Sequence, residues 1–201
     1  MKKFQLPIYL LIFISGLLLI SGCATVKHLP ANIFEGEHDL LVDVTKFPPK
    51  PRMRDSGQGG LIGLLVNASR ASKMKKIFDG IEGETVKELL RQQVRGKLEN
   101  VFYVDEERKD LALEINIVNW GWFVPSTVLG IKTGAYQLEI VGNVTIYSLN
   151  PGKEKIAFNK NIMSQKPLGN DPNSSDTQKM LIMAIEDFSD QVAKFVFHNK
   201  P

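Results

Sequence analysis

The sequence predicts an α+β fold: a two-layer sandwich in which two helices cover one face of an antiparallel sheet. Several segments carry apolar residues at every second position, which indicates strands that are buried on one face only. Two other segments carry apolar residues at helical spacing. Along the chain the elements follow as strand, helix, three-strand meander and helix, an order that favours separate layers of helix and sheet.

The strands are expected in four places. Residues 39–45 form a compact apolar run, and residues 111–118 alternate between apolar and polar or small side chains. The alternation returns at residues 136–146 and again at residues 156–162, where Ile156, Phe158 and Ile162 are taken as the inward-facing positions. This spacing is typical of strands that lie on a core.

Two helices are expected, each with a buried stripe. The first begins near Thr85, where Thr85 and Glu88 fit a capping box, and the second runs over residues 177–197, with Ser175 and Gln178 as a capping box. The stripe of the first helix is Val86, Leu90, Val94 and Leu98, and that of the second is Leu181, Ala184, Ile185, Phe188, Val192 and Phe195.

The first 23 residues have the layout of a secretory signal. Lys2 and Lys3 precede a run without charge, and Ser21 and Gly22 then lead to Cys23. The tetrapeptide Ile20-Ser21-Gly22-Cys23 resembles the lipobox of bacterial lipoproteins. The alternative is an uncleaved membrane anchor, because the apolar run is close to the ~20 residues that span a bilayer.

The resemblance to lipoproteins implies a lipid anchor. In that family a diacylglyceryl group is attached to the cysteine thiol, the chain is cut before the cysteine, and the new amine is acylated. Applied here, residues 1–22 are the signal peptide, residues 23–38 are the lipidated N-terminus and tether, and residues 39–201 are a single periplasmic α+β domain. Ala24 stands where an aspartate would retain an enterobacterial lipoprotein in the inner membrane. The resemblance therefore implies an outer-membrane protein that faces the periplasm.

Charge and cysteine content fit this interpretation. Two of the 25 basic residues lie in the signal peptide, which leaves 23 against 22 acidic residues and a net charge of +1. We therefore expect no nucleic-acid partner. Cys23 is the only cysteine, so an internal disulfide is excluded, and lipidation would protect its thiol in an oxidising compartment.

Catalytic and metal-binding patterns are not found. His28, His38 and His198 are isolated from one another and from carboxylates at metal-ligand spacing. The sequence also lacks the nucleophile elbow of serine hydrolases and the glycine-rich loops that bind phosphates. We expect a protein that is not an enzyme and that needs no metal or cofactor.

Residues 119–130 join two expected strands, yet they contain Trp120, Trp122 and Phe123. An aromatic segment at this position is either an interface that contacts a partner or headgroups, or a continuation of the core. Residues 61–78 pose a similar choice, because an apolar helical face there is flanked by Arg70, Lys73, Lys75 and Lys76. That pattern is typical of an interfacial helix, but an ordinary helix packed on the sheet also produces it.

The functional expectation follows from the anchor and from the lack of catalytic patterns. We expect a non-catalytic binding or assembly factor for envelope components, held on the membrane by its lipid and contacting an envelope protein partner. The layout is similar in outline to small periplasmic lipoproteins that assist outer-membrane assembly, including the lipopolysaccharide-assembly lipoprotein. One alternative is a lipid-binding protein with a cavity lined by Phe158, Phe188 and Phe195, and a less favoured one is an envelope hydrolase. The oligomeric state is left open.

Overall fold

The computed structural model describes residues 39–55, 72–99, 102, 110–124, 127–128, 131–132, 135–149, 152–169 and 172–197. The predicted signal peptide, Cys23, the predicted tether, Arg70 and the three histidines lie outside these residues. The predictions for them are not addressed by the structure.

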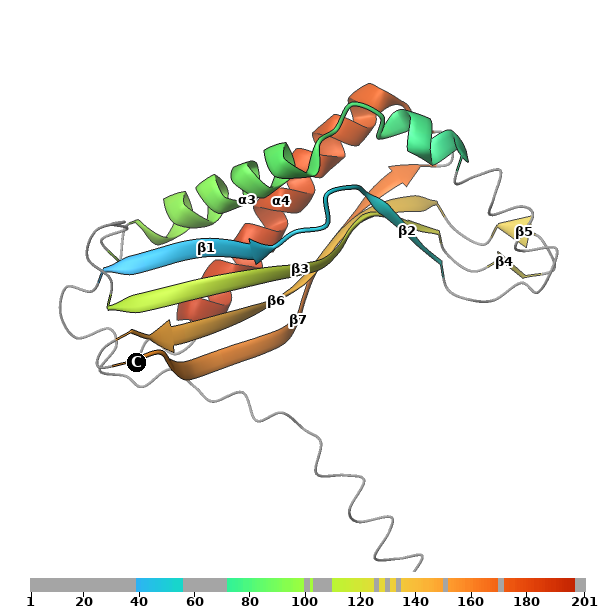
Figure 1. The fold of residues 1–201 in the computed structure, drawn as a ribbon. Helices are drawn as coiled ribbons and strands as arrows, with labels where there is room; N and C mark the ends of the chain where they lie inside the picture. Colours follow the sequence, from blue (N-terminus) through green and yellow to red (C-terminus); the bar gives the residue numbers. More distant parts are fainter. Residues whose placement is uncertain are drawn as a thin grey trace, which may run out of the picture.

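Within the described part of the chain, five strands form one sheet (Figure 1). They are β1 (Leu40–Lys46), β2 (Arg52–Asp55), β3 (Leu111–Val124), β6 (Tyr136–Ser148) and β7 (Glu154–Gly169). The order is β1-β3-β6-β7, and β2 pairs with β3 beyond the end of β1. Two short strands, β4 (Thr127–Val128) and β5 (Ile131–Lys132), pair with each other.

The antiparallel meander of β3, β6 and β7 is confirmed, but the expectation of a wholly antiparallel sheet is wrong. Both β1 and β2 run parallel to β3, with Leu40 opposite Leu111 and Arg52 opposite Gly121. The reason lies in the connection. A helix between two neighbouring strands returns the chain to the end at which it started, and this crossover makes the strands parallel.

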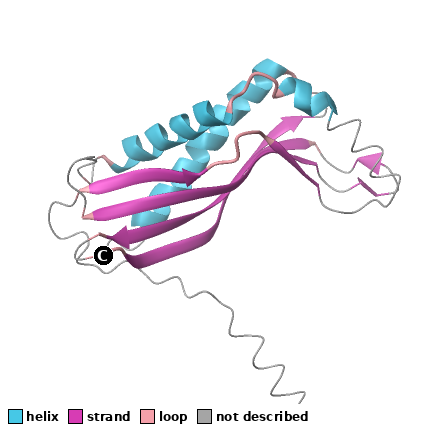
Figure 2. Cartoon of the chain, viewed as in Figure 1, coloured by secondary structure: helices cyan, strands magenta, loops and turns pink. Residues whose placement is uncertain are grey.

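The helices are α3 (Gly83–Leu98), α4 (Ser174–Phe197) and a short stretch at residues 72–77. α4 packs on β6 and β7, α3 packs on β1, and the two helices contact each other. Figure 2 shows α3 and α4 on the same side of the sheet. The predicted mixture of helix and sheet is therefore present.

Both predicted helical stripes are buried in full, whereas both predicted capping boxes are wrong. α3 begins two residues before Thr85, after an N-cap residue Glu82 that makes no side-chain cap, and Glu88 instead binds Arg91. α4 is capped by Asn173, whose Oδ1 accepts the amide of Asp176 at 2.8 Å. Asparagine is a good N-cap, because its side chain satisfies an otherwise unpaired amide of the first turn.

A β-bulge at Val118 carries β3 beyond its predicted end. The pairing with β6 shifts between Ile117 and Asn119, so that Val118 is an extra residue. One extra residue exchanges the two faces of a strand. Before the bulge the inward positions are odd-numbered, such as Ile117, and after it they are even-numbered, such as Trp120 and Trp122. The bulge therefore places both tryptophans on the helix side of the sheet.

Candidate functional site

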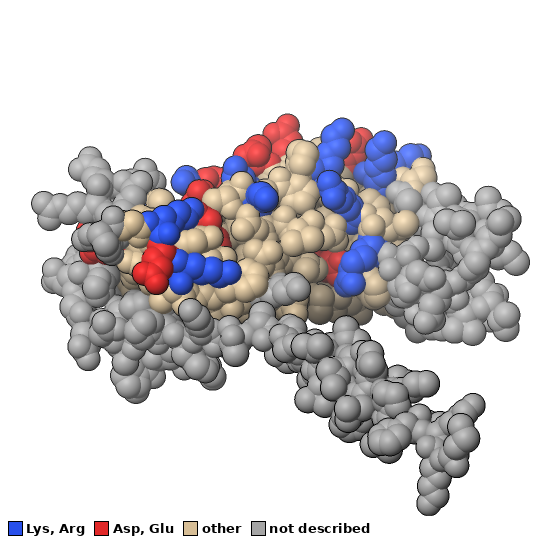
Figure 3. Space-filling model, turned by 60° about the horizontal axis from the view of Figure 1, so that its bottom comes forward, with Lys and Arg blue, Asp and Glu red and all other residues tan. Residues whose placement is uncertain are grey.

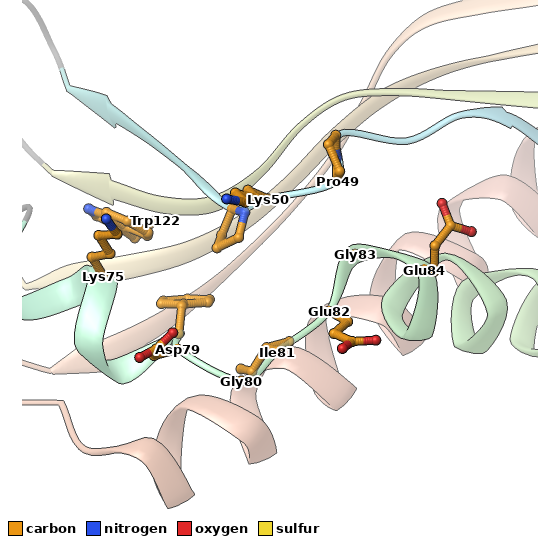
Figure 4. Close-up of a pocket in the computed structure, with 12 residues that line it drawn as sticks. Pro49, Lys50, Lys75, Asp79, Gly80, Ile81, Glu82, Gly83, Glu84 and Trp122 are labelled. Atoms are coloured by element: carbon orange, nitrogen blue, oxygen red, sulfur yellow. The ribbon is translucent and has the colours of Figure 1, made fainter.

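A cleft of about 570 Å³ opens between the β1–β2 connection and the segment that leads into α3 (Figure 4). One wall is formed by Pro49–Pro51, the other by residues 79–84, and Phe78 and Trp122 lie between them. Lys75 of the short helix completes the lining. Small-ligand sites have volumes of about 300–1,000 Å³ and are largely apolar, so this cleft has the size and character of a binding site.

Aromatic side chains form the floor of the cleft. The Phe78 ring lies 5.2 Å from the Trp122 ring and 6.3 Å from the Trp120 ring, measured between centroids. Phe47 adds a further contact to Trp120 at 5.7 Å. Such tilted and edge-on pairs are favourable geometries for aromatic rings, so the cluster supports the cleft from below.

The two tryptophans differ in their hydrogen bonding. Trp120 is fully buried, and its indole N–H donates to the carbonyl oxygen of Pro48 at 2.6 Å. Trp122 is also buried, but its indole nitrogen has no hydrogen-bond partner among the described residues. An unsatisfied buried donor costs about 1–3 kcal/mol. Trp122 therefore has an unused donor beside the cleft.

Close backbone contact fixes the two walls relative to each other. A Cβ added to Gly83 would stand 2.7 Å from the carbonyl oxygen of Pro49 and 2.9 Å from that of Pro48. Real Cβ atoms do not approach backbone atoms so closely. Glycine at the start of α3 is thus required for the prolines to pack against this helix.

Five charged residues line the cleft, and all are exposed: Lys50, Lys75, Asp79, Glu82 and Glu84. Lys50 and Lys75 form no ion pair with the described residues, whereas Glu84 pairs with Lys87 at 3.4 Å between Nζ and Oε2. Figure 4 shows Lys75 beside Trp122, while Glu82 and Glu84 lie by the first turn of α3 at the other end. Asp79 lies on the Lys75 side in the same view, so the Trp122 end carries both signs of charge, whereas the end near α3 is acidic.

The opposite face of the sheet holds a buried carboxylate, Glu139 on β6. Arg54 of β2 donates from Nε and Nη2 to its two oxygens at 2.6 and 2.5 Å. Asn119 of β3 and Gln165 of β7 donate to the same carboxylate at 3.0 and 3.2 Å. The Arg54 guanidinium also lies over the Phe123 ring, 4.7 Å from its centroid. Glu139 thus ties four strands together.

These donors decide the ionisation of Glu139. Burial opposes the charged form, but the hydrogen bonds from Arg54 and Gln165 and the charge of Arg54 outweigh it and hold the pKa of Glu139 below its ordinary value. The same pairing raises the pKa of Arg54. Removal of Arg54 would leave the Glu139 carboxylate buried without its charged partner, which is strongly destabilising. We therefore assign this network to holding β2 on the sheet rather than to acid–base chemistry.

Of the predicted interface residues, Trp120 and Trp122 lie in the core and do not form an exposed tip. Phe123 lies on the other face under Arg54. Lys73, Lys75 and Lys76 are exposed on the short helix, as an interfacial helix would require. However, the apolar side of this helix is occupied by the core, where Met74, Ile77 and Phe78 are buried. The described part of the segment therefore matches the ordinary packed helix.

The predicted cavity lined by Phe158, Phe188 and Phe195 does not form. Phe188 and Phe195 are packed in the core, whereas Phe158 is opposite Thr145 and has the Lys155 ammonium 4.1 Å from its ring centroid. The inward neighbour is Ala157, which pairs with Ile146. Phe158 consequently lies on the other face of the sheet and cannot line a cavity with the α4 residues.

The cleft was not predicted from the sequence, because its walls, Pro49–Pro51 and residues 79–84, belong to no periodic pattern. The one available signal was Pro48-Pro49-Lys50-Pro51, a rigid stretch next to a strand. The described residues contain no group of three potential metal ligands and no helix long and apolar enough to cross a membrane. Figure 3 shows acidic and basic side chains intermixed on the visible face, with a mostly uncharged middle.

Comparison with known proteins found similarity in structure alone. No family model matches the sequence, and no curated protein matches it. Protein XCC0632 from Xanthomonas campestris, of family DUF330, aligns over 85% of this chain and 88% of its own, with 10% identity and a TM-score of 0.56. This score shows a shared fold.

Two further structures score below 0.5. The hypothetical protein CT253 from Chlamydia trachomatis aligns over 82% of this chain and all of its own, with 7% identity and a TM-score of 0.47. Lipoprotein GNA1162 from Neisseria meningitidis aligns over 78% and 99%, with 15% identity and a TM-score of 0.27. The chain therefore shares its overall fold with XCC0632, and at this level of identity the likeness concerns the fold alone.

Proposed function

We propose that this protein is a lipid-anchored lipoprotein of the outer membrane that faces the periplasm and binds an envelope component without catalysing a reaction. The cleft beside Trp122 is its binding site. The anchor is supported by the signal-like residues 1–22 and by Cys23. The binding role is supported by one observation above all: an apolar cleft with an aromatic floor and a buried N–H donor that has no partner among the described residues.

The construction of the cleft favours binding. Its walls come from three places in the sequence and are fixed by the Gly83 contact and by the Trp120–Pro48 hydrogen bond. Preformed sites bind more tightly, because less conformational freedom is lost on association. The carboxylates that line it, Asp79, Glu82 and Glu84, are exposed, so they provide charge without a buried acid or base.

Site-specific photocrosslinking in intact cells tests the binding site. A benzoylphenylalanine at Ile81 places the reactive group on the cleft wall. The matched control is the same substitution at Ile182, a position on α4 that is 60% exposed and outside the cleft. We expect one defined adduct from position 81 that is lost when Trp122→Ala is added, and none from position 182. Equal labelling at both positions, or at neither, would show that the cleft is not the binding site.

Mass measurement of the mature N-terminus tests the anchor separately. We expect a chain that begins at Cys23 and carries its acyl groups, found with the outer-membrane fraction. A chain that retains Met1, or an unmodified Cys23, would contradict the lipoprotein assignment. Cys23→Ser is expected to carry no acyl chain and to be lost from the outer-membrane fraction, because every acyl group is attached to that residue.

A further inference from the structure

We propose that the ligand of this cleft is a single-chain anionic amphiphile, a molecule with one apolar chain and one carboxylate or phosphate head. The inference rests on the proposed function, since it names the class of component that the same site binds. Its apolar part lies on the aromatic floor, and its head lies at the end where Lys75 and Trp122 meet (Figure 4).

The lining provides the surface for the apolar part. Pro49 and Pro51 from one wall, Ile81 from the other, and Phe78 and Trp122 from the floor contribute rings or branched carbons. A ligand held there removes apolar area from water, which is the main source of affinity in such sites. The volume of about 570 Å³ suits one chain.

Three groups favour an anion at the tryptophan end, where two cations, Lys50 and Lys75, stand against one carboxylate, Asp79. Lys50 and Lys75 are exposed cations without an ion-pair partner in the described chain. The Trp122 N–H is a buried donor that lacks an acceptor among the described residues. Hydrogen bonds from a donor to an ionised acceptor are stronger than those between neutral groups.

The acidic end fixes the direction of binding. Glu82 and Glu84 lie by the first turn of α3, away from Lys75 (Figure 4). An anionic head placed there would be repelled, whereas a terminal methyl group would not. The charge pattern along the cleft therefore selects an amphiphile with a single anionic head and disfavours a molecule with anions at both ends.

Fluorescence quenching provides the test, because Trp120 and Trp122 are the only tryptophans. The acylated full-length mature protein is placed in phosphatidylcholine nanodiscs and titrated with a brominated sixteen-carbon fatty acid. Its methyl ester, a brominated alkyl phosphate and a brominated alkyl trimethylammonium are titrated in parallel. We expect saturable quenching by the two anions, about tenfold weaker binding of the ester and the cation, and most of the quenching lost in Trp122→Phe.

Substitutions of the two lysines test the site while Trp122 stays in place as the fluorescent reporter. Lys50→Gln with Lys75→Gln is expected to weaken binding of the fatty acid about tenfold, whereas Lys179→Gln on α4 leaves it unchanged. Equal binding of the fatty acid and its methyl ester would overturn the proposal that the ligand has an anionic head. Quenching that does not saturate, or that is unchanged in Trp122→Phe, would overturn the proposal that the cleft binds an amphiphile. If the crosslink at position 81 is still formed in that case, the proposed binding function stands and its ligand belongs to another class.

Discussion

Gly121 of β3 lies directly opposite Arg52 of β2, and the two backbones touch at this point. A Cβ added to Gly121 would stand 2.6 Å from the amide nitrogen of Arg52, and the Gly121 φ of +139° is one that L side chains rarely adopt. β2 can therefore approach β3 only past a glycine. Two residues further on, this approach brings Arg54 within reach of Glu139.

Replacement of Gly121 by alanine should loosen β2. We expect Gly121→Ala to lower the free energy of unfolding by about 1–3 kcal/mol, because the new methyl group meets backbone atoms and the backbone is strained. Urea denaturation measures the change. Gly96→Ala in α3 is the matched control: it has open space around it and should stabilise the helix by about 0.5–1 kcal/mol. Equal effects at the two positions would refute the close contact.

The Glu139 network should make stability depend on pH. Because folding lowers the pKa of Glu139 below its ordinary value of 4.5, its stabilisation is complete above that value and is lost as the pH falls through the lower folded-state pKa. We expect Glu139→Gln to cost about 1–3 kcal/mol at pH 7 and progressively less below about pH 4.5. Thermal unfolding of both proteins from pH 7 to pH 3 measures the difference.

Glu84→Gln serves as the control for this pH series. Its pair with Lys87 is exposed, and exposed pairs contribute about 0–1 kcal/mol. We expect little change in stability at any pH. A penalty for Glu139→Gln that stays constant down to pH 3 would mean that packing, rather than the charge of Glu139, stabilises β2.

The stability of the fold should depend on the presence of a residue at position 118 but not on the Val118 side chain. Its side chain is 60% exposed, so Val118→Ser should change the free energy of unfolding by about 0.5 kcal/mol or less. Deletion of Val118 removes the bulge and would turn Trp120 and Trp122 to the other face, so we expect no cooperative unfolding transition. A folded deletion variant with native near-ultraviolet circular dichroism would contradict this account of β3.

The two tryptophans form a matched pair for measuring the value of one hydrogen bond. Trp120→Phe leaves the Pro48 carbonyl without its donor, whereas Trp122→Phe removes a donor that has no partner among the described residues. We expect Trp120→Phe to be the more destabilising by about 1 kcal/mol in urea denaturation. The reverse order would indicate that Trp122 is engaged by a partner in solution.

Much of the fold could be predicted because burial imposes a period. The stripe from Val86 to Leu98 and the alternation from Leu111 to Ile117 show which face of the helix and which face of the strand are buried. The parallel pairing of β1 could not be obtained in this way, since the alternation of a strand is the same in either direction. Only the helix that connects β1 to β3 indicates it.

The bulge and the cleft were not predictable for a different reason. One extra residue at Val118 exchanged the two faces, so the tryptophans after it looked like an apolar loop. A similar shift in β7 gave Ala157 the inward position that was expected for Phe158. The cleft depends on contacts between Gly83 and Pro49, which are distant in the sequence and belong to no periodic pattern.

The parallel pairing of β1 has a consequence for the order in which the domain can assemble. Thr45 of β1 bonds Asn116 of β3 at a separation of 71 residues, so the edge strand has no partner until β3 has been made. β3, β6 and β7 can pair with near neighbours as they emerge. Long-range pairs close large loops and form slowly. The apolar strand Leu40–Lys46 therefore stays unpaired until β3 is available, and an unpaired apolar strand is prone to aggregate.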